Sequence, residues 1–284
     1  MTKRKNKRKY GGLKILWFII RIPYFIAKVI YLGIKYLVDG IIYLKNEGKK
    51  TSKKIKQRKI EREIQEKRED IVAVYNDFEI LKEIQGNYLE WEKKIHDSDS
   101  RIGIILGARG SGKSAFGIKF LENFQAKKNK KCFAMGFKSS EMPSWIKVVE
   151  GVEELDNDSV VLIDEGGILF SSRNAMSNAN KLLSELILVA RHKNLSILFI
   201  SQNSSNLDVN ILRQSDFLVL KPSSLLQKDF ERKIIQKLYE KAEEDFESFK
   251  DNKGATHIYS SSFVGFVSNP LPSFWGEKIS KSFG

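Results

Sequence analysis

The sequence predicts an α/β fold in which a mostly parallel β-sheet carries helices on both faces. Short apolar runs, typical of buried strands, alternate along the chain with segments whose apolar residues recur every three or four positions. The chain has 284 residues, of which 42% are hydrophobic and 30% are charged. This composition can bury a core, and it excludes global disorder, a collagen-like chain and a polytopic membrane protein.

The net charge of +14 suggests that the chain binds an acidic partner, either nucleic acid or an anionic membrane. Residues 1–69 contain 21 Lys and Arg against 6 Asp and Glu, whereas residues 70–284 contain 28 against 29. The excess therefore belongs to the first quarter of the chain, and the remainder is almost neutral. The single cysteine, Cys132, excludes an intrachain disulfide framework and a cysteine-cluster metal site.

Residues 1–48 read as a basic tail followed by a membrane-associated helix. The tail is Thr2–Lys9, and the apolar stretch Leu13–Leu44 exceeds the roughly 20 residues that span a bilayer. Basic residues interrupt the stretch every seven positions, which places them in one stripe on a helix: Lys14, Arg21, Lys28 and Lys35.

Three interpretations of this stretch remain open. A basic stripe suits a helix lying in the membrane interface, with Lys and Arg reaching toward the phosphates of anionic lipid, and we favour this interpretation. A transmembrane helix would have to bury several charges. A basic amphipathic helix can also pack on protein. The positive segments on both sides favour the cytoplasmic face of a membrane.

Residues 49–98 are predicted to form a charged helical stalk and a packing helix. The segment Lys49–Glu69 is rich in Lys, Arg and Glu, with opposite charges at helical spacing. From Ile71 an apolar pattern with steps of three and four predicts one amphipathic helix, which the pair Gly86-Asn87 could interrupt: Val74, Phe78, Leu81, Ile84, Tyr88, Trp91 and Ile95.

A glycine-rich loop carries the clearest chemical signal. The apolar run RIGIIL leads into GARGSGKS, which is followed by a segment with helical spacing. A GxxxxGK[ST] loop between a strand and a helix is a phosphate-binding loop, because its backbone N–H groups and the helix N-terminus face the phosphates. This motif predicts a P-loop NTPase with the following cofactor-binding residues: Gly107, Ala108, Arg109, Gly110, Ser111, Gly112, Lys113 and Ser114. Lys113 would contact the phosphates of ATP, and the Ser114 hydroxyl would bind Mg²⁺.

Two carboxylates follow the next strongly apolar run. VVLI is suited to a strand buried on both faces, and it ends at Asp164 and Glu165. At the tip of a parallel strand beside the loop, Asp164 would join Ser114 in holding Mg²⁺. Glu165 would orient and deprotonate a hydrolytic water. This pair favours hydrolysis over transfer to a small acceptor.

A third strand, SILFI, is predicted to end between the phosphate loop and the carboxylate pair. Gln202 follows this strand and would sense phosphate or position water. Arg191 precedes the same strand, so it is expected at the opposite end of the sheet from its own nucleotide. It would there serve a neighbouring subunit as an arginine finger, although a basic residue is also favoured at a helix C-terminus.

The remaining segments complete a predicted ATPase domain over residues 99–284. Strands are expected at 131–137 and 216–221, a long helix at 225–250, and a terminal hairpin or paired edge strands at 257–262 and 263–269. The chain has no guanine-specifying NKxD sequence after the loop, so ATP is favoured over GTP.

From about Arg101 to its end, the chain resembles the N-terminal ATPase domain of the zonula occludens toxin family, within the FtsK/HerA branch of P-loop ATPases. The resemblance rests on four segments: GARGSGKS, VVLIDEGG, SELILVARHKNLSILFISQNSSNLD and LPSFWGEKISKSF. It implies nucleotide and Mg²⁺ ligands at Lys113 and Ser114, a metal-binding Asp164 and a catalytic Glu165. It also implies a sensor at Gln202 and a candidate finger at Arg191. Residues 166–167 are Gly-Gly, where relatives commonly have Ala or Val and then His.

Together with the apolar N-terminal stretch, the motifs predict a membrane-associated ATPase motor. It is expected to work as a homo-oligomeric ring, such as a hexamer, because an arginine finger that acts in trans needs a neighbouring subunit. The resemblance implies that its task is to move DNA or a nucleoprotein, or to assemble or export a filament. In the phage proteins the membrane segment follows the ATPase domain, whereas here it precedes it. Two alternatives remain open: a nucleotide-gated membrane scaffold or switch with little turnover, and a DNA-binding protein that contacts DNA through its basic tail.

Overall fold

The computed structural model describes residues 23, 26–37, 40, 43, 45, 68–98, 100–165 and 175–276. The chain divides into two compact units, Met1–Glu63 and Ile64–Gly284. Several predicted features lie outside the described residues: the basic tail, much of the apolar stretch, the stalk as far as residue 67, the Gly-Gly pair at 166–167, and residues 277–283.

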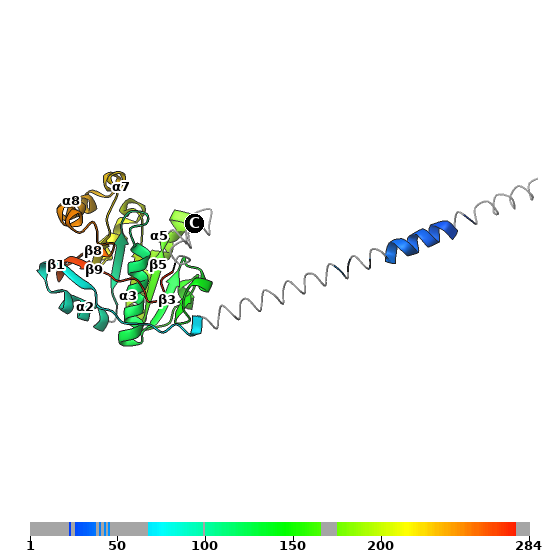
Figure 1. The fold of residues 1–284 in the computed structure, drawn as a ribbon, viewed down its shortest axis with the longest axis horizontal. Coiled ribbons are helices and arrows are strands. Elements are labelled where there is room, and N and C mark those ends of the chain that lie inside the picture. Colours follow the sequence, from blue (N-terminus) through cyan, green and yellow to red (C-terminus); the bar gives the residue numbers. More distant parts are fainter. Residues whose placement is uncertain are drawn as a thin grey trace, which may run out of the picture. The chain divides into compact units, whose positions relative to one another are not determined.

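In the first unit, residues 26–37 are helical, as the periodicity of the apolar stretch predicts (Figure 1). Apolar side chains of this helix are exposed, including Ile30 and Tyr36, and so are the basic residues Lys28 and Lys35. Among the residues that the structure describes, no helix combines the length and the apolar character needed to span a membrane.

The second unit is built on one sheet, which has nine strands within the described residues (Figure 1). Their order is β1-β9-β8-β7-β2-β6-β5-β3-β4. The strands from β7 to β4 in this order run parallel, and β8, β9 and β1 add antiparallel strands at one edge. Their bounds are β1 Glu79–Gly86, β2 Ile102–Leu106, β3 Lys131–Met135, β4 Ile146–Val148, β5 Ser159–Asp164, β6 Ser196–Ile200, β7 Phe217–Leu220, β8 Ala255–Ser260 and β9 Phe263–Ser268.

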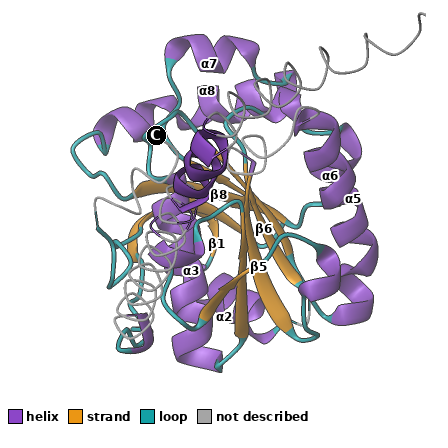
Figure 2. Ribbon diagram, turned by 90° about the vertical axis from the view of Figure 1, so that its right-hand side faces the viewer, coloured by secondary structure: helices purple, strands orange, loops and turns teal. Residues whose placement is uncertain are grey.

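Helices cover both faces of this sheet, as the sequence predicts (Figure 2). On one face, α2 (Tyr88–Asp97) and α3 (Lys113–Lys128) bury Trp91 and Phe116 against the strands. On the other, Leu186 and Tyr239 come from the helices packed there: α5 (Ala175–Lys193), α6 (Val209–Gln214) and α8 (Lys233–Ser248). The fold is thus an α/β fold with a mostly parallel sheet.

The central strands β2, β5 and β6 are buried along their whole lengths, which explains their continuous apolar runs. Consecutive residues of a strand point to opposite faces, so Ile105 joins the core beneath α3 while Ile104 joins the core beneath α5. The predicted terminal hairpin is confirmed, because β8 and β9 pair antiparallel.

The single packing helix predicted from residue 71 is wrong. Residues 71–78 have no regular secondary structure, β1 follows as an edge strand paired with β9, and only α2 is helical. The apolar spacing predicted a helix wrongly because Val74, Ile80 and Ile84 are exposed and do not share a buried helix face. Strand β1 completes the sheet of the second unit, so this compact unit begins well before the predicted boundary at residue 99.

The segment before β1 is held by polar side chains of α3. Lys119 donates to the Val74 carbonyl (2.9 Å), to Asn76 (2.7 Å) and to Glu122 (2.8 Å). Glu122 in turn accepts from the Val74 N–H (3.2 Å) and from the backbone and hydroxyl of Ser273, near the end of the described chain. The segment before β1 and the segment at Ser273 are therefore fastened to the same helix.

The long helix predicted over residues 225–250 is also wrong in one respect. It divides into α7 (Leu225–Phe230) and α8, with the break at Glu231 and Arg232. Glu231 is buried and accepts from the backbone N–H of Ser204 (2.7 Å) and from its hydroxyl. The extended backbone of Arg232 then begins α8. This tertiary contact interrupts a segment that local propensity alone would make continuous.

Candidate functional site

The glycine-rich loop joins the end of β2 to the start of α3, as its motif predicts. Gly112 is the N-cap of α3 and has φ +91°, a left-handed conformation that glycine adopts without strain. A Cβ atom at Gly107 would lie 2.6 Å from the Cβ of Lys221, so this position has no room for a side chain. The loop therefore needs glycine both for its turn and for its close approach to the neighbouring strand.

Lys113 lies at the first position of α3, and its side chain bends back over the loop. Its ammonium group donates to the carbonyl oxygens of Gly107 (2.7 Å) and Ala108 (2.9 Å). Burial lowers its pKa, while the charges of Asp164 and Glu165 act in the opposite direction. The ammonium group is thus held within the loop, where it can exchange these carbonyl oxygens for phosphate oxygens.

Ser114 and Asp164 meet although they come from different elements. The Ser114 hydroxyl donates to Asp164 Oδ2 across 3.2 Å, because α3 begins at the sheet edge where β5 ends. Oxygen ligands of this kind suit Mg²⁺, which commonly takes one or two protein oxygens and completes its shell with phosphate and water. Among the described residues, no cluster of three or more His, Cys, Asp or Glu offers a fuller protein cage. The pair therefore fits Mg²⁺ bound together with a nucleotide.

Glu165 is the first residue after β5 and is buried. Its carboxylate accepts a hydrogen bond from the Ser201 hydroxyl, and it also accepts from the Gln202 backbone N–H and the Asn206 side chain. Burial raises the pKa of Glu165, and these hydrogen bonds act against that effect. A carboxylate with a raised pKa, fixed next to Asp164, is suited to accept a proton from water.

Strand β6 lies between β2 and β5, as predicted, so its tip separates the phosphate loop from the carboxylate pair. The side chain of Gln202 is exposed, while its carbonyl oxygen accepts a hydrogen bond from Gln227 of α7. The structure therefore brings the backbone of Gln202 to Glu165 and leaves the amide side chain at the surface.

Arg191 lies in the last turn of α5, which precedes the beginning of β6. Because β2 and β6 are parallel, this is the opposite end of the sheet from the phosphate loop. The side chain is exposed. The position agrees with the expectation that Arg191 does not reach the nucleotide of its own chain.

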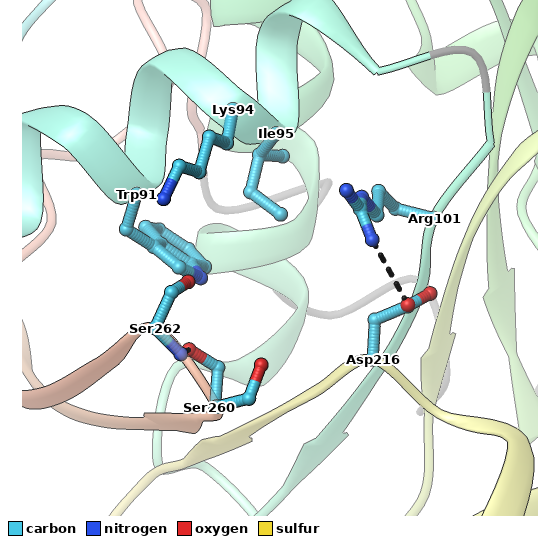
Figure 3. A pocket seen from close by; sticks show the side chains of 8 residues that line it. Trp91, Lys94, Ile95, Arg101, Asp216, Ser260 and Ser262 are labelled. Atoms are coloured by element: carbon cyan, nitrogen blue, oxygen red, sulfur yellow. Dashed lines mark hydrogen bonds and ion pairs between the residues drawn. The ribbon is translucent and has the colours of Figure 1, made fainter.

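A pocket of about 210 Å³ also lies at the opposite end of the sheet (Figure 3). Arg101, the residue before β2, lines the pocket, and its guanidinium donates to Asp216 across 3.1 Å. Helix α2 contributes Trp91 and Lys94. Strand β2 runs from this pocket to the phosphate loop, so the five residues of the strand separate the two by roughly 17 Å. The pocket is therefore distinct from the candidate nucleotide site.

Sequence reasoning missed three residues around the site: Ser201, Asn206 and Lys221. The first two bind Glu165, and the third lies against the loop glycines. Ser201 directly follows β6, where polar residues at a strand tip mark the ligand edge of a parallel sheet, so this signal could have identified it. Nothing in the sequence distinguishes Lys221 from the other lysines of this basic chain.

No protein family model and no curated protein sequence matches the chain. Solved structures similar to it include B204, the DNA-packaging ATPase from Sulfolobus turreted icosahedral virus, with 16% identity and a TM-score of 0.40. The match covers 62% of this chain and 99% of that one. The genome-packaging NTPase B204 of Sulfolobus turreted icosahedral virus 2, in complex with ATP-gammaS, has 18% identity and a TM-score of 0.43, covering 61% and 98%.

The N-terminal domain of zonular occludens toxin from Neisseria meningitidis is also among the similar structures. It has 14% identity and a TM-score of 0.36, and the match covers 65% of this chain and 99% of that one. The family that the sequence resembles is therefore found among the structural neighbours of the chain.

Proposed function

We propose that this chain is an ATP hydrolase that works as a motor, coupling hydrolysis to the translocation of DNA or nucleoprotein or to the assembly of an exported filament. The proposal of ATP hydrolysis rests on the contact of Ser114 with Asp164, which are the chain neighbours of Lys113 and Glu165. The coupling to movement is supported by the resemblance of residues 184–208 to the zonula occludens toxin family.

Each residue has a separate role in this proposal. Lys113 and the loop N–H groups bind the phosphates of ATP, while Ser114 and Asp164 hold Mg²⁺. Bound Mg²⁺ supplies charge neutralisation to the phosphoryl oxygens. Glu165 orients the attacking water and accepts its proton, and Ser201 fixes the carboxylate for this task.

The proposed location is the cytoplasmic face of a membrane. The supporting observation is the helix at residues 26–37, whose apolar side chains are exposed while Lys28 and Lys35 carry the basic stripe. Sedimentation of the full chain with anionic vesicles, compared with a chain lacking residues 1–48, tests this part. Equal sedimentation of the two would contradict it.

The proposed assembly is a homo-oligomeric ring in which Arg191 serves the nucleotide of the next subunit. Its exposure at the sheet end opposite its own loop supports this arrangement. Mixing Arg191→Ala chains with Glu165→Gln chains should restore part of the activity, because some mixed interfaces keep both residues. A stable monomer with ATP bound would contradict the ring.

The variant Glu165→Gln tests the hydrolase directly. We expect steady-state turnover to fall at least about 100-fold while ATP binding persists, because a general base contributes about 10²–10⁴ in rate. The exposed Glu240, changed to Gln, provides a matched control with wild-type turnover. Equal turnover of Glu165→Gln and wild type would refute the assigned role. If the wild type bound ATP without turnover, the nucleotide-gated scaffold or switch would be favoured. ATPase assays with and without DNA test whether DNA is the substrate that is moved.

A further inference from the structure

Lys221 directly follows β7 and is completely buried, with 0% of its surface exposed. Its backbone N–H donates to the Leu106 carbonyl at the end of β2 (2.8 Å). A Cβ atom at Gly112 would lie 3.5 Å from its Cε and 3.8 Å from its Nζ, and one at Gly107 would collide with its Cβ. The side chain therefore runs along the phosphate loop and ends close to the loop residue that begins α3.

The ammonium group of Lys221 is held by four oxygen atoms. It donates to the carbonyls of Gly254 (3.0 Å) and Ala255 (3.2 Å), to the Thr256 hydroxyl (2.7 Å) and to the Asn269 side chain (2.7 Å). These atoms come from the residue before β8, from the first two residues of β8 and from the residue after β9. An ammonium group has three N–H donors and no acceptor, so this cage of oxygens suits the charged form of lysine.

None of these four oxygens carries a formal charge. Burial lowers the pKa of Lys221 to about 7, without a compensating carboxylate among its hydrogen-bond partners in the described chain. The titratable side chains on the elements around it include Arg109 and Lys113 of the loop, His257 and Tyr259 of β8, and Tyr239 of α8. The Tyr239 hydroxyl donates to the Lys221 carbonyl (3.2 Å), and burial lowers the pKa of His257 to about 4. Exposed Lys253 lies at the hairpin base. The site thus holds a cation in a position where a bound phosphate would compensate it.

We propose that Lys221 is a second cation of the nucleotide site, which stabilises bound phosphates from the inner side of the loop and ties the loop to the β8–β9 hairpin. This inference rests on the proposed function, because it assumes that the loop binds a nucleoside diphosphate or triphosphate. Lys221 is a positioning residue, since its oxygen cage keeps the ammonium group from touching the nucleotide. A buried charge is weakly screened by salt, so it acts across the thickness of the loop.

The test compares Lys221→Gln and Lys221→Met with wild type in titrations of ADP and ATP. Both variants remove the charge, but Gln keeps an N–H donor for the cage. We expect Kd to rise about tenfold for both nucleotides in both variants, with thermal unfolding used to confirm that each variant is folded. Lys253→Gln removes a charge from an exposed side chain near the same turn, and it should bind like wild type.

Calorimetry of the wild type in two buffers of different ionisation enthalpy adds a measurement that does not depend on a variant. At pH 7.5 we expect ADP binding to take up a fraction of a proton, because the phosphates raise the pKa of Lys221, and Lys221→Gln should lose this uptake. Wild-type affinity in Lys221→Gln, or no proton uptake by the wild type, would overturn the proposal. Failure of the wild type to bind ADP and ATP would instead refute the proposed function on which it rests.

Discussion

The hydroxyl of Ser114 donates a hydrogen bond to Oδ2 of Asp164 across 3.2 Å, although 50 residues separate them in the chain. The contact exists because α3 starts, and β5 ends, at the same edge of a parallel sheet. It brings an alcohol and a carboxylate oxygen together near the start of α3, where Lys113 lies, so the proposed ligands of the metal and of the phosphates converge at one place.

Removing either oxygen ligand should abolish metal-dependent turnover. We expect Ser114→Ala and Asp164→Asn to lower kcat at least about 100-fold, since a metal ion contributes several kcal/mol of charge stabilisation in the transition state. Turnover measured against Mg²⁺ concentration tests this, and ATP binding in excess chelator should be unchanged. A variant that kept wild-type dependence on Mg²⁺ would remove that residue from the metal site.

Replacing Ser201 by Ala should make hydrolysis more sensitive to acid. The Ser201 hydrogen bond lowers the pKa of Glu165 against the opposing effect of burial, so its loss raises that pKa further. The acidic limb of the pH–rate profile should then move to higher pH. At pH values on the acidic side of the profile, turnover should be roughly tenfold lower than in the wild type, since a hydrogen bond to a charged group is worth about 1.5–3 kcal/mol.

The control for this experiment is Ser205→Ala, which changes an exposed serine after the same strand. It should leave the profile in place. If Ser201→Ala reduced turnover equally at every pH, the serine would not act through the protonation of Glu165.

His257 should make the fold sensitive to acid. It is buried and stacked on Phe266, with ring centroids 4.6 Å apart, and burial lowers its pKa to about 4 against a small opposing effect of Asp245. The unfolded chain takes up this proton below about pH 6.5 and the folded chain only below about pH 4. The stability that the fold gains by keeping His257 neutral is therefore complete above about pH 6.5, and it is lost as the pH falls toward 4.

Urea unfolding at pH 7.5 and pH 5 measures this contribution. His257→Phe should reduce the loss of unfolding free energy between the two pH values by about 2 kcal/mol. Changing exposed His192 to Gln should not affect the difference. An unchanged difference in His257→Phe would show that the folded protein accommodates the charged imidazole.

The buried pair Lys119–Glu122 should be costly to break. Both side chains are 0% exposed, so Lys119→Met leaves a buried carboxylate and should cost about 3–5 kcal/mol in unfolding free energy. The double variant Lys119→Met, Glu122→Gln removes the charge but keeps an acceptor for Val74 and Ser273, so it should recover much of this loss. A double variant as unstable as the single one would assign the cost to packing.

Much of the candidate site could be predicted because its signals are local. The motif around Lys113 and Ser114, and the apolar run before Asp164 and Glu165, each occupy fewer than ten consecutive residues. Parallel strands with helical connections then require the two segments to meet at one sheet edge. The terminal hairpin was also predictable, since alternation persists on both sides of its turn.

The two wrong secondary-structure predictions concern segments in which a long-range contact overrides the local apolar periodicity. The steps of three and four after residue 71 suggested a helix, but the open edge of β9 offered backbone partners that make β1 a strand. Similarly, the buried contact of Glu231 with Ser204 divides a segment of continuous helical propensity. Neither partner can be identified from spacing along the chain, because pairing depends on which edges the completed sheet leaves open.

Local sequence was thus sufficient for the fold class, the phosphate loop and the two acids, because strand, loop and helix signals extend over only a few residues. Tertiary structure alone assigned Ser201 to Glu165 and placed Lys221 against the loop glycines. These two side chains matter because of their burial and their hydrogen-bond partners. The partners lie 33–48 residues away from them in the chain. Serine and lysine are common residues, and only the packed sheet makes these particular ones exceptional.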